Sequence, residues 1–201
     1  MFSIFGKRCI LAFERSIHPS KKDRNDFIRP QNCNQKHTKP DRKVSTKFIM
    51  DIEIKKINSS ENEIVTELFD KYRTFYKQSN IELAKTYTKE RLEKNEAQIY
   101  GAFKKENPKP IGFTLLYPKP SFVSTNKNWH IGYLFVEIDQ RKKGIGQRLV
   151  NTALNFAKKE GAKFISLNTE NDNYPAQKLY ENLGFVREGF FSGYFYYQYN
   201  L

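Results

Sequence analysis

The chain has 201 residues, and its 38% hydrophobic and 15% aromatic content is enough for one domain with a core of its own. Its net charge of +13 is uneven: residues 1–49 carry 12 Lys and Arg against 4 Asp and Glu, which places +8 there and +5 in residues 50–201. This mild excess gives no specific indication of a nucleic-acid partner. No apolar run approaches the roughly 20 residues of a membrane-spanning helix, which argues against a membrane protein.

Cysteine and histidine are too few and too scattered to predict a disulfide framework or a metal site. Cys9 and Cys33 are the two cysteines, and the histidines are His18, His37 and His130. We therefore expect the reducing cytoplasm as the compartment, and no metal cofactor.

Residues 1–49 have the composition of a disordered basic arm. Lys, Arg, Asn and Gln are interrupted by prolines, and hydrophobic periodicity is weak. Met50 then opens a well-patterned segment, which predicts a domain over residues 50–201. Two interpretations of the arm stay open: sequence upstream of a true start at Met50, or a solvated extension. A targeting peptide is the weaker interpretation, because acidic residues interrupt the basic run.

The first half of the domain has the pattern of a strand, two helices and a hairpin. Alternating isoleucines predict the strand, and Ser59 or Ser60 with Glu63 predicts a capping box that opens the first helix. The expected elements are a strand at 52–57, a helix from about 60 to 76, a break at 79–80, a helix at 81–94, strands at 97–104 and 111–117, and a loop at 118–128.

The second half alternates strands and helices before ending in strands. We expect a strand at 129–137, a helix from Gln147, a strand at 163–169, a helix after Asn173 and two further strands between Phe185 and Tyr199. The whole order is therefore β-α-α-β-β-β-α-β-α-β-β.

The run from Arg141 to Gly146, of sequence RKKGIG, lies between a strand and a helix start. At the N-terminus of a helix, backbone N–H groups have no partner within the helix, and the macrodipole adds partial positive charge. Glycines let the backbone approach an anion closely, and three basic side chains add charge. The run therefore predicts a phosphate-binding loop, although a plain solvated turn has the same composition.

A second segment, from Asn173 to Phe185, reads as one amphipathic helix with a cap and a stop. Its apolar residues recur at spacings of three and four, Asn173 is a suitable N-cap, and Gly184 suits the C-terminal end. Tyr180 lies on the apolar face, where a tyrosine is more often a packing residue than a reactive one.

Together and in this order, the two segments resemble the acyl-CoA-binding core of the GNAT superfamily of N-acetyltransferases. The first matches the pattern Q/R-x-x-G-x-G/A at Arg141, Gly144 and Gly146, and the second matches N-x-x-A-x-x-L-Y-x-x-x-G-F at every fixed position. Lys142 stands where many relatives have glycine. The resemblance implies an α/β (α+β) fold, with a mixed, mostly antiparallel central sheet and helices on both faces.

The resemblance also implies acetyl-CoA as the donor, bound where the strand ending at Val136 splays away from the strand ending at Thr169. Backbone groups of Leu134, Phe135 and Val136 would pair with the pantetheine amides, and Asn173 would contact the same arm. The pyrophosphate would be held beside Arg141 by the N–H groups of Lys142, Lys143, Gly144, Ile145 and Gly146.

The resemblance implies that Tyr180 donates a proton to the leaving thiolate, whereas the general base is less well defined. Several relatives carry acidic residues just before the Leu-Phe-Val strand, where this chain has Gly132 and Tyr133. His130, on the strand face expected to hold Gly132 and Leu134, and Glu170, at the end of the next strand, are the two candidates. A structural role is the alternative for each of them.

The predicted activity is direct transfer of an acetyl group from acetyl-CoA to a primary amine of a small molecule or peptide, through a ternary complex. No cysteine lies near the motifs, which argues against an acyl-cysteine intermediate. The alternative is a non-catalytic acyl-CoA-binding or protein-interaction module. The aromatic C-terminal strands are compatible with a homodimer, and the sequence does not identify the amine.

Overall fold

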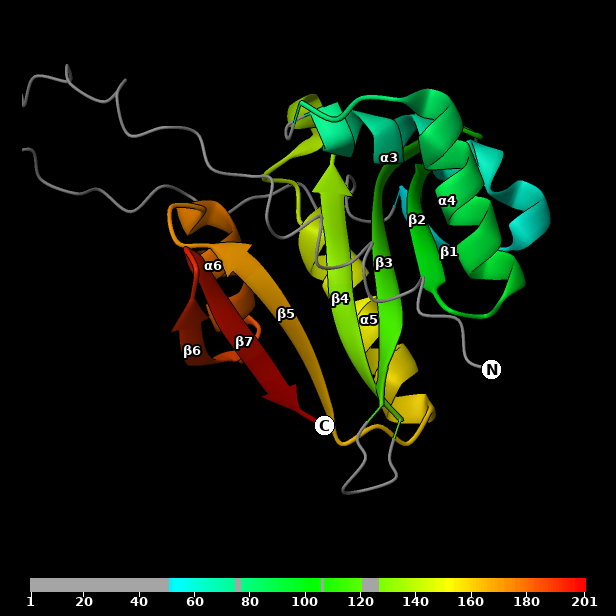
Figure 1. Cartoon of the computed structure of the whole chain (residues 1–201). Helices are drawn as coiled ribbons and strands as arrows, with labels where there is room; N and C mark the ends of the chain where they lie inside the picture. Colours follow the sequence, from blue (N-terminus) through cyan, green and yellow to red (C-terminus); the bar gives the residue numbers. More distant parts are fainter. Residues whose placement is uncertain (1–50, 75–76, 106, 121–126) are drawn as a thin grey trace, which may run out of the picture. The chain divides into compact units, whose positions relative to one another are not determined.

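The computed structural model describes residues 51–74, 77–105, 107–120 and 127–201. The predicted arm, with Cys9, Cys33 and Met50, lies outside the described residues. Within them, seven strands form one sheet in the order β1-β2-β3-β4-β5-β7-β6, with helices packed on it (Figure 1). No helix in this part of the chain combines the length and apolarity that a membrane span requires.

The elements follow the predicted order. In the first half they are β1 (Ile52–Ile57), the 3₁₀ turn η1 (Ser59–Glu61), α3 (Glu63–Thr74), α4 (Ile81–Glu93), β2 (Gln98–Lys104), β3 (Pro110–Pro120) and β4 (Lys127–Val136). In the second half they are η2 (Ile138–Gln140), α5 (Ile145–Lys159), β5 (Phe164–Glu170), α6 (Tyr174–Asn182), β6 (Val186–Phe191) and β7 (Tyr194–Asn200). The predicted fold class is confirmed.

Two predictions about where elements begin and end were wrong. The capping box forms at Asn58 and Glu61 rather than at Ser59 or Ser60 with Glu63, and the backbone N–H of Asn58 donates to Glu61 Oε2 at 3.2 Å. Asparagine is as good an N-cap as serine, so the same chemistry acts earlier in the chain.

The second wrong prediction is the loop at 118–128, because residues 118–120 and 127–128 lie in strands, while 121–126 lie outside the described residues. β3 continues to Pro120, with Pro118 opposite Trp129 and Lys119 opposite Asn128. The prolines in this segment suggested a loop, but proline is tolerated in a strand where the ladder does not need its missing N–H.

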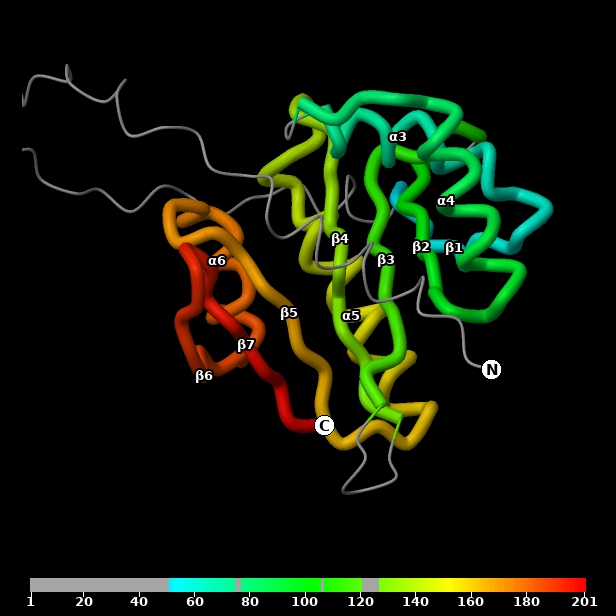
Figure 2. The backbone as a smooth tube through the Cα atoms, viewed as in Figure 1, coloured from blue at the N-terminus to red at the C-terminus, as the bar shows by residue number. Residues whose placement is uncertain are grey.

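The helices cover the two faces of the sheet in pairs. α3 and α4 pack on one face, where Leu68 and Phe69 meet Phe113 and Leu115 in a common core cluster. α5 and α6 lie on the other face (Figure 2). Their residues Val150 and Tyr180 belong to the core cluster on that side. Strands β1 to β4 therefore divide their buried side chains between the two faces of the sheet.

A β-bulge at Gly132 changes which face the β4 side chains occupy. Leu115 pairs with Tyr133 and Leu116 with Ile131, so Gly132 is the extra residue on β4. Ile131 consequently packs on the face of the sheet covered by α5, while Tyr133 packs on the face covered by α3. The prediction that His130 shares a face with Leu134 was wrong for this reason: His130 stacks on Tyr117, next to the α3 core.

β4 and β5 are paired only at their beginnings. They run parallel, and the paired residues are Trp129 with Ile165, His130 with Ser166, and Ile131 with Leu167. Beyond these pairs the two strands separate, and β5 bends away from β4 in Figure 2. We call residues 132–136 of β4 and 168–170 of β5 the divergence. The splay predicted between these strands is confirmed.

Candidate functional site

The divergence leaves one edge of β4 without a neighbouring strand. Phe135 is buried, but Gly132, Tyr133, Leu134 and Val136 are each only partly buried, so solvent reaches this edge. The opposite edge of β4 is paired with β3 up to Val136, which lies opposite Gly112. An edge of this kind offers backbone N–H and C=O groups to an extended ligand.

The basic loop closes over the end of this edge. Arg141 Nε donates to the carbonyl oxygen of Val136 at 3.0 Å, and its guanidinium lies 5.8 Å from the centre of the Phe135 ring. Lys143 Nζ donates to Gln140 Oε1 at 3.2 Å. Arg141 thus supports the strand end, and the Val136 carbonyl, one of the predicted pairing groups, already accepts this hydrogen bond.

The loop before α5 contains two residues in the left-handed conformation, and the second of them directly precedes the helix. Gly144 has a φ of +77° and precedes the first residue of α5, while Lys142 has a φ of +60°. The first turn of α5 holds no acidic residue, and nothing lies within 4 Å of the position a Gly144 side chain would occupy. The start of α5 is therefore open and electropositive, as an anion site requires.

Gly146 marks the point where α5, α6 and β4 meet. A Cβ atom there would lie 3.4 Å from Leu179 Cδ2 on α6 and 4.0 Å from Val136 Cγ2 on β4. The structure therefore brings the basic loop, the end of β4 and α6 together, although the two motifs are separated along the chain.

α6 follows β5, the second strand of the divergence, and its N-terminus is capped by a side chain. Asn173 Oδ1 accepts from the backbone N–H of Ala176 at 3.3 Å, which confirms the predicted N-cap. The helix ends before Gly184, whose φ of +93° suits only glycine without strain. The Asn173 amide nitrogen is the part of this side chain that does not serve the cap.

Tyr180 points from α6 into the core beneath β5 and β7. Its side chain is 6% exposed, and its ring centre lies 5.8 Å from that of Phe185 and 6.2 Å from that of Tyr197. The sequence left open that Tyr180 is a packing residue, and its ring does pack in the core. The role of its hydroxyl stays a prediction.

His130 lies in the segment where β4 and β5 are paired. Its Nδ1 is 3.0 Å from Ser166 Oγ, and its ring stacks on Tyr117 with centres 5.7 Å apart. Burial, assisted by the nearby charge of Lys119, lowers the pKa of His130 to about 4. At neutral pH the imidazole is therefore uncharged and weakly basic.

We expect His130 to make the protein sensitive to acid. The unfolded chain protonates this residue near pH 6.5 and the folded chain only near pH 4, so the stability lost between these values is on the order of 2–3 kcal/mol. Urea unfolding at about pH 7.5 and about pH 4.5 measures this loss, and it should be smaller in His130→Gln. Equal losses in the variant and the wild type would contradict the assignment.

Glu170 ends β5 on the far side of the divergence. Burial and the neighbouring charge of Asp172 raise the pKa of Glu170 above its ordinary value, despite a hydrogen bond with Tyr194 that acts in the opposite direction. The Glu170 carbonyl accepts from Gln177 Nε2 at 3.1 Å, which ties the strand end to α6. The two predicted base candidates are therefore separated along the strands. His130 on β4 lies opposite Ser166 of β5, and Glu170 lies four residues beyond Ser166.

A group of tyrosines near His130 was not predicted as part of the site. Tyr117 and Tyr133 are hydrogen-bonded to each other through their hydroxyls, and Tyr133 also to Tyr87 on α4. Burial raises the pKa of both the Tyr117 and Tyr133 hydroxyls well above the ordinary value. These residues are far apart in sequence, and the high aromatic content of the chain was the one feature of the sequence that indicated a cluster of this kind.

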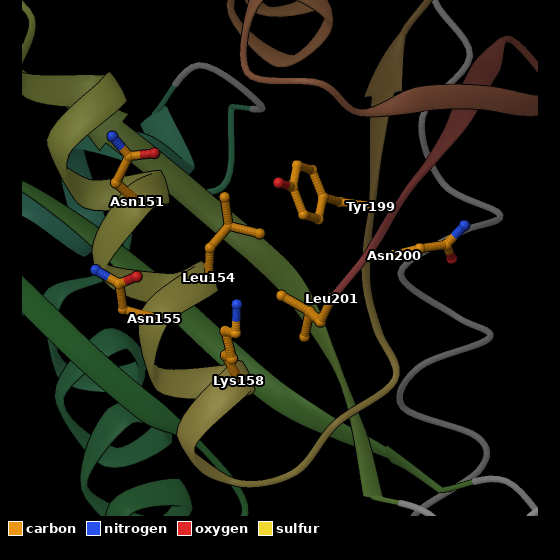
Figure 3. Close-up of a pocket in the computed structure, with 7 residues that line it drawn as sticks. All are labelled: Asn151, Leu154, Asn155, Lys158, Tyr199, Asn200 and Leu201. Atoms are coloured by element: carbon orange, nitrogen blue, oxygen red, sulfur yellow. The ribbon is translucent and has the colours of Figure 1, made fainter.

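Two grooves among the described residues are lined by residues outside the divergence. One, of about 390 Å³, runs between α5 and the C-terminal end of β7 (Figure 3). It is lined by Asn151, Leu154, Asn155, Lys158, Tyr199, Asn200 and Leu201. The other, of about 630 Å³, lies between α3, the segment 107–111 and residues Glu137, Asp139 and Gln140, which follow β4. Neither contains a predicted site residue, and the described residues hold no cluster of three potential metal ligands.

Comparison with known proteins agrees with the geometry. The model of the "Acetyltransferase (GNAT) family" matches residues 63–185. The uncharacterized N-acetyltransferase YhfO of Bacillus subtilis (strain 168) is 39% identical over 136 residues, which are 67% of this chain and 90% of that protein.

Solved structures show the same relationship. A crystal structure of a "probable acetyltransferase" is 30% identical, with a TM-score of 0.65 over 70% of this chain and 93% of the other. A chain of the NatC complex bound to Gag peptide and CoA is 25% identical, with a TM-score of 0.58 over 76% of this chain and 99% of that one. The family match covers both the basic loop and α6, so this protein belongs to the GNAT family and is an N-acetyltransferase.

Proposed function

We propose that the protein transfers an acetyl group from acetyl-CoA directly to a primary amine of a small molecule or peptide. The observation that carries this proposal is the meeting of three features at one place: the open edge of β4, the electropositive start of α5, and α6, whose Leu179 lies beside Gly146. An elongated donor with an anionic end fits such an arrangement, with its acyl end at the divergence.

The donor would be bound mainly by the backbone. Groups of Leu134 and Phe135 on the open edge suit the pantetheine amides, because an extended ligand can pair there as an added strand would. The pyrophosphate suits the loop from Lys142 to Gly146, where the helix N-terminus and two lysines provide positive charge. The Asn173 amide nitrogen remains available to the pantetheine arm from the other side.

Tyr180 is proposed as the group that protonates the departing CoA thiolate. A phenol is a weak acid that is protonated at neutral pH, so it can donate a proton as negative charge develops on sulfur. Its ring is fixed by Phe185 and Tyr197, which limits the positions that its hydroxyl can take.

The proton released by the amine has two proposed acceptors. Glu170 is the stronger candidate, because burial raises its pKa and so brings it closer to that of an ammonium group. His130, with a pKa of about 4, is uncharged but a weak base.

We therefore expect Glu170→Gln to lower kcat at neutral pH by about 10²-fold and His130→Ala by less than about tenfold. Steady-state kinetics with one saturating amine measures both effects, and the Kd for acetyl-CoA serves as the control for intact donor binding. Near-normal turnover in both variants would show that solvent removes the proton.

The activity itself is tested by thiol release from acetyl-CoA with a panel of amines, polyamines, amino acids and peptides. Saturable release that depends on an amine supports the proposal. Tight binding of acetyl-CoA without turnover of any amine would instead support the alternative of a non-catalytic acyl-CoA-binding module. Isothermal calorimetry with acetyl-CoA separates these outcomes from a protein that binds no donor.

A further inference from the structure

The hydroxyl of Tyr117 lies on the bulge where β4 and β5 begin to separate. A Cβ atom built on Gly132 would be 1.9 Å from Tyr117 Oη and 2.2 Å from Tyr117 Cζ. The phenol therefore occupies the space in which a side chain of residue 132 would begin. Gly132 is also the first residue of β4 beyond the last pair with β5, so the hydroxyl stands at the closed end of the divergence.

Packing holds this hydroxyl in place from several sides. The Tyr117 ring stacks on His130 at 5.7 Å with an angle of 14° between the planes, and meets Tyr133 edge-on at 6.3 Å. A hydrogen bond joins the Tyr117 and Tyr133 hydroxyls, and a second joins Tyr133 to Tyr87 on α4. A fixed polar group at a mostly apolar position is a typical way of orienting a ligand.

We propose that Tyr117 Oη accepts a hydrogen bond from the nitrogen of the acceptor amine and so orients it toward the thioester. This assignment rests on the proposed function. A phenol oxygen with one hydrogen bond from a neighbour can still accept another, and burial keeps it uncharged. An uncharged acceptor orients an amine without binding it as tightly as a carboxylate would, which leaves the nitrogen free to react.

This position restricts the acceptor to amines with an uncrowded nitrogen. Gly132 provides no side chain, and the phenol fills the space beside it, so the nitrogen must come close to both. An unbranched primary amine fits this description, whereas a secondary amine has one N–H fewer to donate and carries an additional carbon beside the nitrogen.

The test is a comparison of three tyrosine-to-phenylalanine variants. In Tyr117→Phe we expect kcat/KM for a primary amine to fall about tenfold or more, with an unchanged Kd for acetyl-CoA, because one hydrogen bond to the reacting nitrogen is lost. Tyr133→Phe removes the same hydrogen bond between the two tyrosines but leaves the hydroxyl over Gly132, so its kcat/KM should stay within about threefold. Tyr100→Phe, on the α5 face of the sheet, is the unrelated control.

The outcomes separate the inference from the proposed function. If the wild type acetylates no amine, the proposed function fails. If the wild type is active and Tyr117→Phe has wild-type kcat/KM, the assignment of Tyr117 is wrong. Equal losses in Tyr117→Phe and Tyr133→Phe would also overturn it, because they would assign the effect to the packing of the tyrosines. Urea unfolding of each variant verifies that the fold is intact.

Discussion

Replacing Gly132 with alanine is expected to destabilise the protein by about 2–4 kcal/mol and to abolish most of its activity. The added methyl group would lie 1.9 Å from Tyr117 Oη, far below any normal contact, and the nearby atoms belong to a ring that is stacked on His130. The phenol has to move or the bulge has to open, and overpacking of this kind usually costs about 1–3 kcal/mol, occasionally more. Chemical denaturation measures the loss of stability.

The matched control is Gly189→Ala in β6, where nothing lies within 4 Å of the added methyl group. This variant should unfold within about 0.5 kcal/mol of the wild type. A double-mutant cycle with Tyr117→Ala tests the cause directly, because Gly132→Ala should cost much less once the ring is absent. If the cost of Gly132→Ala is the same with and without the ring, contact with Tyr117 is not the reason for the glycine.

The elements that depend on local sequence were predicted well. α6 begins after Asn173 because that side chain caps it, and it ends near Gly184 because glycine takes a left-handed conformation easily. The basic loop before α5 was recognised for the same kind of reason, since glycines and charges at a helix start act over a few residues. The motifs of the proposed donor site could therefore be identified from the sequence alone.

The proposed acceptor contacts join residues that are far apart in the sequence, and the sequence did not predict them. From the sequence, Gly132 was noted as a place where several relatives carry an acidic residue. The pairing of β4 with β3 makes Gly132 the extra residue of a bulge, and the bulge reverses the faces of the residues on either side of it. His130 was consequently assigned to the wrong face. The hydroxyl over Gly132 comes from Tyr117, on a neighbouring strand, and no periodicity along the chain connects these two residues.

Tyr180→Phe is expected to lower kcat by about 10²- to 10⁴-fold while leaving the fold and the Kd for acetyl-CoA nearly unchanged. Phenylalanine keeps the ring that packs against Phe185 and Tyr197, so the core loses no apolar volume. What disappears is the hydroxyl, and with it the proposed proton donor to the thiolate. Single-turnover measurements with bound acetyl-CoA isolate the chemical step from substrate binding.

Tyr197→Phe is the matched control for this prediction, because it removes a hydroxyl from a buried tyrosine only 6.2 Å away, measured between ring centres. The Tyr197 hydroxyl donates to Glu181 Oε1 at 2.8 Å and accepts from Arg187 Nε at 3.2 Å, so it serves a structural network between α6 and the C-terminal hairpin. This variant should lose stability by about 1 kcal/mol and keep its kcat. A Tyr180→Phe enzyme with wild-type kcat would remove Tyr180 from the chemistry and leave protonation of the thiolate to water.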